Sequence, residues 1–187
     1  MISLICSIAA AIFYIAASGF ILTQLKHKRP LASPWLQAFA ACAISFHAAG
    51  LYQIIIPGNG FNLTLLAVSS LMFLAVNSIV LFSSLQKPMH NLYLFLFPLS
   101  AIAVLLSLIA PEPHELLHLP QGTLIHVILS IAAYSVLFIA TLQALLLAYQ
   151  NWHLRHRHPG GLVRLLPPLQ LMAVSYTHLT LPTTPYV

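Results

Sequence analysis

Residues 123–149 read TLIHVILSIAAYSVLFIATLQALLLAY, an unbroken run without aspartate, glutamate, lysine or arginine. A helix rises 1.5 Å per residue, so about 20 apolar residues cross the roughly 30 Å hydrocarbon core of a bilayer. This run therefore predicts a membrane-spanning helix, and four similar runs precede it. The fold class we expect is all-α, a polytopic transmembrane helix bundle. The five predicted spans are Ile2–Leu25, Pro34–Ile56, Leu63–Leu85, Leu92–Ala110 and Thr123–Tyr149.

The composition of the 187-residue chain agrees with this fold class. Hydrophobic residues make up 60% of the chain, charged residues make up 5%, and the mean hydropathy is +0.93. A soluble domain carries about 25% charged residues, because its surface must be hydrated. These values exclude a soluble enzyme, a disordered chain and a nucleic-acid-binding protein as first interpretations.

The basic residues occur only in alternate connecting segments. They follow the first, third and fifth predicted spans, and the segments after the second and fourth have none. Cytoplasmic loops carry the excess of lysine and arginine. The pattern therefore predicts an N-terminus outside and an arginine-rich segment inside, so the positive charge sets topology and does not form a nucleic-acid footprint. The seven cations are Lys26, Lys28, Arg29, Lys87, Arg155, Arg157 and Arg164.

Residues 173–187 continue no pattern found before them. Back-translated, 174–183 fit GTC TCT TAT ACA CAT CTG ACG CTG CCG ACG, which looks like a transposon end and sequencing adaptor read in frame. Such segments are excluded from fold reasoning. We expect 173–187 to be non-native, and 1–172 to be part of a longer transmembrane domain of about eight spans. A genuine polar tail is the alternative.

The loop before the fifth span contains an HExxH pattern, formed by His114, Glu115 and His118. In zinc proteases both histidines lie one turn apart on a helix, and a third ligand completes the site. Here Pro113 and Pro120 leave too few residues for a stable helix between them. The sequence also holds no acidic residue further along the chain that could be the third ligand. We therefore reject a zinc site and expect a histidine-rich external loop.

Two histidines lie within predicted spans, where an ionisable side chain is costly and by default marks a functional site. His47 lies near mid-membrane, and His126 lies a few residues below the external surface. Neutral imidazole is a good axial ligand for haem iron. Ser130 and Tyr134 follow His126 on the same side of the helix, so they are candidate cavity-lining residues. Interhelical hydrogen bonds and ordinary packing are the alternative roles for all four side chains.

Two further polar side chains lie inside predicted spans. Asn77 is in the third span, and Gln53 is near the outer end of the second. The sequence alone assigns no role to either.

Four short stretches resemble one family of membrane proteins. The run from Gly122 through His126 and Ser130 to Tyr134 resembles a helix start in the cytochrome c assembly (CcsA/CcmC/HemX-like) family of haem-handling proteins. Three others resemble its YpjD-like inner-membrane branch. They are Phe46-His47-Ala48, 61–66 (FNLTLL) and 166–169 (LPPL).

The resemblance implies a bundle of about eight spans in the bacterial inner (plasma) membrane. It implies a protein that binds haem through histidines and delivers it for cytochrome c assembly or haem metabolism, without catalysis of its own. His126 matches the helix-start histidine of the family, and His47 matches the second-span histidine of the branch. Haem is the cofactor this implies, and other cytochrome c maturation components are the protein partners it implies. The family's tryptophan-rich external segment has no counterpart here, since Trp35 and Trp152 both lie near the predicted inner face.

Two other functions stay open beside haem handling. One is a membrane transporter or scaffold without haem, in which His47 and His126 are structural. The other, more remote, is a metalloprotease that uses the HExxH residues.

Overall fold

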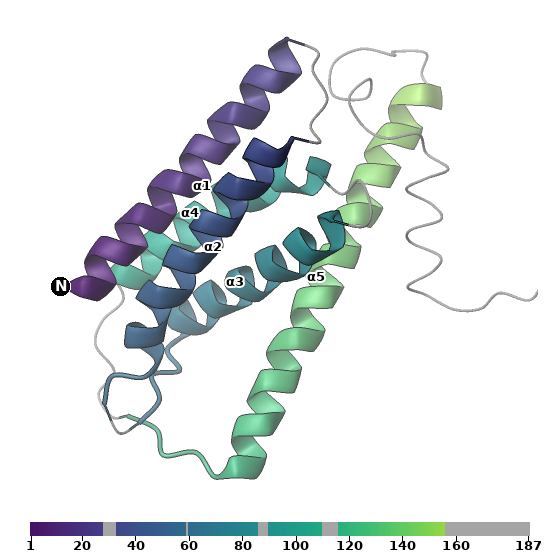
Figure 1. The fold of residues 1–187 in the computed structure, drawn as a ribbon. Coiled ribbons are helices and arrows are strands. Elements are labelled where there is room, and N and C mark those ends of the chain that lie inside the picture. The colour runs from purple at the N-terminus through teal and green to yellow at the C-terminus, as the bar shows by residue number, and fades with distance from the viewer. Residues whose placement is uncertain (28–32, 59, 86–89, 110–115, 156–187) are drawn as a thin grey trace, which may run out of the picture. The chain divides into compact units, whose positions relative to one another are not determined.

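A computed structural model describes residues 1–27, 33–58, 60–85, 90–109 and 116–155, with side chains as far as 153. The chain divides into two compact parts, Met1–Val136 and Leu137–Val187. Among the described residues, five helices are long and apolar enough to cross a membrane, which confirms the predicted fold class and all five predicted spans. The helices are α1 (Ile2–Lys26), α2 (Pro34–Ile55), α3 (Leu65–Ser84), the short 3₁₀ helix η1 (His90–Leu92), α4 (Tyr93–Leu108) and α5 (Gln121–Arg155) (Figure 1).

The last helix is longer than its predicted span. It extends the prediction at both ends, from Gln121 to Arg155. Thirty-five residues at 1.5 Å each reach about 50 Å, well beyond the hydrocarbon core. The additional turns therefore carry the polar residues at the two ends of α5 outside the hydrocarbon.

Within the part Met1–Val136, the first four helices pack in a closed order. α1 contacts α2 and α4, and α3 contacts the same two helices. Consecutive spans run in opposite directions, so every neighbouring pair in this ring is antiparallel. The arrangement is a four-helix bundle in which each helix turns one face inward and another toward lipid.

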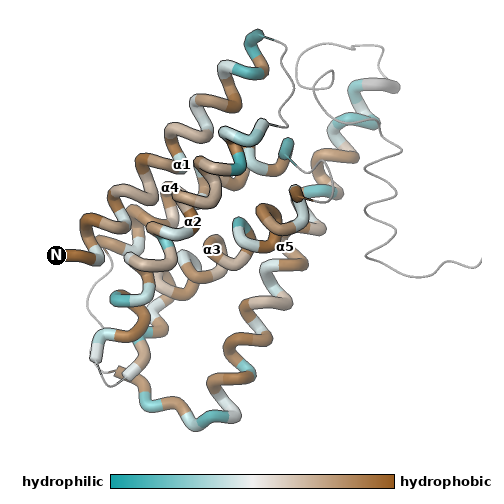
Figure 2. The backbone as a smooth tube through the Cα atoms, in the orientation of Figure 1, coloured by the Kyte–Doolittle hydropathy of each residue, from teal (hydrophilic) through white to brown (hydrophobic). Residues whose placement is uncertain are grey.

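The inward faces of the bundle combine small and polar residues with some large apolar and aromatic side chains, while many large aliphatic side chains point out. On α1, for example, Ile5, Ile12 and Ile15 are each more than half exposed. Lipid tails are as apolar as these side chains, so a membrane bundle associates through close packing and hydrogen bonds. Figure 2 shows hydrophobic colour over much of the long helices, interrupted by hydrophilic residues. The buried residues are Ser7, Ala10, Ala11, Tyr14, Ala17 and Ile21 on α1, and Leu36, Ala40, Ala43, His47, Gly50, Leu51 and Ile55 on α2.

α1 and α2 approach each other closely at Gly50. A Cβ atom there would lie 2.6 Å from Ser7 Oγ, 3.0 Å from Ser7 N and 3.2 Å from Ser3 O. Two of these three atoms belong to the backbone of α1 and cannot rotate away. The absence of a side chain at Gly50 therefore lets the two helices touch.

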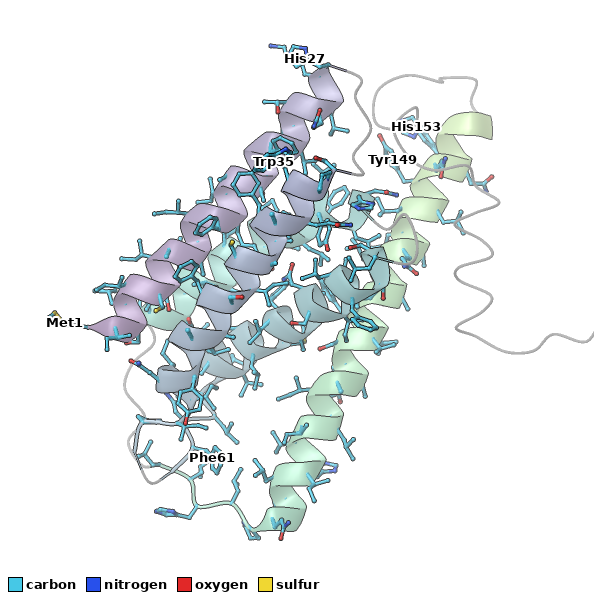
Figure 3. The ribbon with its side chains drawn as sticks, viewed as in Figure 1. Met1, His27, Trp35, Phe61, Tyr149 and His153 are labelled. Carbon is cyan, nitrogen blue, oxygen red and sulfur yellow. The ribbon has the colours of Figure 1, made fainter. Side chains whose placement is uncertain are left out.

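The loops after α2 and before α5 meet at one end of the bundle. Phe61 N donates to Leu117 O at 2.9 Å, and Leu117 N donates to Phe61 O at 3.0 Å. Figure 3 shows Phe61 at this end, and His27 and Trp35 at the other. Both loops were predicted to be external, so their pairing agrees with the predicted alternation. Lys28, Arg29, Lys87, Arg157 and Arg164, and the tail 173–187 with the proposed boundary at 172, lie outside the described residues.

Replacing Gly50 by alanine is expected to destabilise the protein by about 1–3 kcal/mol, because the added methyl overpacks the α1–α2 contact. The matched control is Gly19→Ala. Gly19 is also helical, but a Cβ atom there would meet nothing within 4 Å, so alanine is expected to stabilise by about 0.5–1 kcal/mol. Unfolding in mixed detergent micelles measures both changes. Equal effects at the two sites would contradict this account of the interface.

The orientation is testable by labelling single cysteines. In a chain with Cys6 and Cys42 replaced by alanine, we expect His118→Cys to react with an impermeant maleimide added to intact cells. His27→Cys should react only after the cells are opened, because it lies at the end of α1 that the charge pattern predicts to be cytoplasmic. Labelling of His27→Cys alone in intact cells would reverse the assigned topology.

Candidate functional site

His47 lies at the centre of the four-helix bundle and is 2% exposed. Its Nδ1 lies 3.2 Å from the Tyr14 hydroxyl of α1, and its Nε2 lies 2.9 Å from Ser70 Oγ of α3. One ring nitrogen donates and the other accepts, and hydroxyl groups can serve either tautomer. Both polar atoms of the imidazole are therefore paired, and the histidine joins three helices.

Aromatic rings extend this cluster to the fourth helix. The Tyr14 ring meets His47 edge-on at 5.8 Å, and Phe97 of α4 lies 5.6 Å from Tyr14. Phe97 in turn stacks on Tyr93 at 4.5 Å. The cluster that begins at His47 therefore includes side chains from all four helices, with α4 reached through Tyr14.

A second set of polar contacts joins α3 to α4. Asn77 Nδ2 donates to Ser100 Oγ at 2.6 Å, and the Ser84 and Tyr93 hydroxyl groups are 3.2 Å apart. All four side chains are buried. Asn77, to which the sequence assigned no role, is therefore an interhelical contact. Gln53, the other unassigned interior polar residue, is exposed on α2.

His126 is in a different environment, on the first turns of α5. It is exposed, and Thr123, Ser130 and Tyr134 follow the same face at spacings of three or four residues. Tyr134 is 63% exposed, and Ser130 is half-buried. The opposite face of α5 carries Ser135, whose hydroxyl donates to Met72 O of α3 at 3.4 Å. Among residues 121–136, we refer to Thr123, His126, Ser130 and Tyr134 as the polar face of α5.

The two candidate ligands do not form one site in this conformation. Among the described residues, neither a hydrogen bond nor a ring contact joins His47 to His126. His47 is fully paired inside the bundle, whereas His126 is open to an incoming group. The structure thus places the predicted pair in two unlike environments.

The HExxH residues lie largely outside the described chain. His114 and Glu115 belong to the undescribed segment 110–115, and His118 is exposed in the loop before α5. Within the described residues, no three histidine, cysteine, aspartate or glutamate side chains gather where they could hold a metal ion.

Sequence reasoning missed Tyr14 and Ser70, the two partners of His47. A signal was present in the spacing. On α1, the buried residues Ser7, Tyr14 and Ile21 are seven residues apart. On α3, the buried residues Ser70, Asn77 and Ser84 have the same spacing. Such a repeat keeps one face of a helix against its neighbour.

These features define the class of the protein. It is a multi-pass helical membrane protein in which several interior polar side chains pair across helices. It is distantly homologous to the inner membrane protein YpjD of Escherichia coli, in strains K12, O6:H1 and O157:H7. The match is 29% identical over 145 residues, which is 75% of this chain and 54% of each relative.

The chain therefore spans about half the length of the curated relatives it matches. No protein-family model matches it, and no solved structure matches it. Homology to an inner membrane protein confirms the predicted multi-pass membrane localisation and the predicted relationship to YpjD. The wider resemblance to the cytochrome c assembly family stays a prediction.

Removing the Tyr14 hydroxyl tests the interhelical role of His47. Tyr14→Phe is expected to cost about 0.6 kcal/mol and at most about 1.7 kcal/mol, the range measured for hydrogen bonds between membrane helices. Tyr52→Phe is the matched control, because Tyr52 is 64% exposed at the outer end of α2. Unfolding in mixed micelles compares the two. A larger loss at Tyr52 would argue against a stabilising Tyr14–His47 bond.

Proposed function

We propose that this chain is an integral membrane haem-handling protein that binds haem at the polar face of α5 through His126. It would bind and deliver haem in cytochrome c assembly or haem metabolism, without turnover chemistry of its own. The observation that carries the proposal is an exposed imidazole, without a partner among the described residues, on the polar face of a long and mostly apolar helix. The proposal also draws on the resemblance of this helix start to haem-handling proteins.

The residues of this face suit an amphipathic ligand with a metal centre. His126 makes no hydrogen bond to the described part of the chain, so a ring nitrogen is free to coordinate iron. Ile125 and Leu129 beside it are 51% and 63% exposed and offer apolar surface. The hydroxyl groups of Ser130 and Tyr134 can donate hydrogen bonds to carboxylate groups. Bound haem would supply an iron whose reactivity the surrounding helices tune through axial ligation and burial.

His47 does not fit the role of a ligand in this conformation. Both of its ring nitrogens are hydrogen-bonded, and it is 2% exposed among aromatic rings. A coordinating imidazole needs one nitrogen free for the metal while the other holds a hydrogen-bond partner. His126 is therefore the first ligand we would test. His47 could become a second only if Ser70 or Tyr14 were released.

The test is the absorbance of the full chain purified from haem-replete cells. We expect a Soret band that weakens strongly in His126→Ala, because the axial ligand is removed. His118→Ala is the matched control, since His118 is also exposed but lies in the loop before α5; its Soret band should be unchanged. A protein without haem, or equal loss in both variants, would contradict the proposal.

A membrane transporter or scaffold without haem is the second candidate. The observation that favours it is the paired polar interior of α1–α4, in which His47 already has structural partners. It predicts no cofactor and an unchanged fold when His47 and His126 are both replaced by glutamine. The absorbance measurement above separates this function from the first.

A further inference from the structure

The polar side chains between α3 and α4 follow a common seven-residue spacing. On α3 the buried positions are Ser70, Asn77 and Ser84, and on α4 they are Tyr93, Ser100 and Ser107. Asn77 pairs with Ser100 and Ser84 pairs with Tyr93. The same antiparallel register places Ser107 at the level of Ser70. We call these six side chains the α3–α4 seam.

The seam reaches a histidine at each end. At the outer end Ser70 contacts Nε2 of His47 at 2.9 Å. At the cytoplasmic end, the ring of His90 in η1 lies 6.4 Å from that of Tyr93. Both imidazoles are buried, 2% and 5% exposed. The seam therefore lies between two buried ionisable groups, with Ser70 hydrogen-bonded to His47 and Tyr93 in ring contact with His90.

Two atoms of this set have no hydrogen-bond partner among the described residues. They are Oδ1 of Asn77, whose side chain is fully buried, and Nε2 of His90. Leaving such an atom unpaired is costly, and buried polar atoms without protein partners are normally bonded to internal water. Successive levels of the seam are roughly 10 Å apart along the helix, a gap that a few waters can bridge.

We propose that the α3–α4 seam is a hydrated path along which protons move between His90 at the cytoplasmic end and His47 in the bundle core. Each hydroxyl group of Ser84, Tyr93 and Ser70 accepts one proton and releases another, so no net chemistry occurs along the path. Asn77, through its free side-chain carbonyl oxygen, orients the water between the Ser84–Tyr93 pair and Ser70. His47 is the terminal acceptor and returns its proton by the same route.

The charge distribution around the seam suits transient protonation. The ionisable side chains that face it are Tyr14 and His47 at one end and Tyr93 and His90 at the other. Within the described residues of α1–α4, the only charged side chain is Lys26, exposed at the end of α1. No fixed charge in the described part of these helices traps a proton on the path.

The proton path is tested by hydrogen–deuterium exchange at the His47 ring. The full chain carries ¹⁵N-labelled histidine in liposomes, and the His47 signal is assigned by its loss in His47→Gln. We expect exchange to be about tenfold slower in Asn77→Leu, because losing one buried hydrogen-bonding group costs about 1.4 kcal/mol in the transfer barrier. If Asn77→Leu does not insert into the membrane, Ser100→Ala serves instead, because Ser100 is the hydrogen-bond partner of Asn77. This variant should also slow exchange at the His47 ring.

Two controls separate a path from ordinary packing. Ser78→Leu changes the residue next to Asn77 on α3. Ser78 lies on an exposed face, and its hydroxyl bonds Leu74 O of its own helix. Exchange at the His47 ring in this variant should match the wild type. Asn77→Ser keeps a hydrogen-bonding group and should stay near the wild-type rate. If a substitution only destabilised the bundle, the bundle would open more often and exchange at the His47 ring would become faster. Unchanged or faster exchange in Asn77→Leu, or equal slowing in Ser78→Leu, would overturn the proposal, and neither result depends on haem.

Discussion

Within hydrocarbon, a polar side chain is costly unless it finds a hydrogen-bond partner inside the protein. The imidazole of His47 meets this constraint with Tyr14 on one side and Ser70 on the other, so a single residue holds α1, α2 and α3 together. Most other serine hydroxyl groups of these helices bond a carbonyl of their own helix, as Ser45 does to Ala41 O. Ser70 differs from them because its hydroxyl bonds a side chain of another helix. This bond positions α3 against α2.

Close packing and polar pairing act together in this bundle. Gly50 and Ser7 bring the backbones of α1 and α2 into contact, at the level next to His47. Asn77 with Ser100, and Ser84 with Tyr93, fix the register of α3 against α4. A slip of either helix by one residue would leave these polar groups facing lipid, at a cost in free energy. The positions of the polar side chains therefore specify the pairing of helices that are otherwise alike in composition.

The number of spans and their approximate ends follow from the sequence because hydropathy depends only on local composition. The environments of His47 and His126 do not. Each is a lone histidine in an apolar run, and local sequence cannot tell which neighbour faces it. The difference arises from helix phase: His47 shares the inward spacing of Ala40 and Ala43 on α2, whereas the inward face of α5 passes through Ser135. Only packing against the other helices sets that phase.

The paired backbones of Phe61 and Leu117 have a consequence for biogenesis. The two residues of this bridge lie in different loops: Phe61 precedes the α3–α4 hairpin in the chain, and Leu117 follows it. They can meet only after both helices of that hairpin have crossed the bilayer and returned the chain to the same side. The bridge is therefore a late event in membrane insertion, and it ties the start of α5 to a hairpin that is already in place.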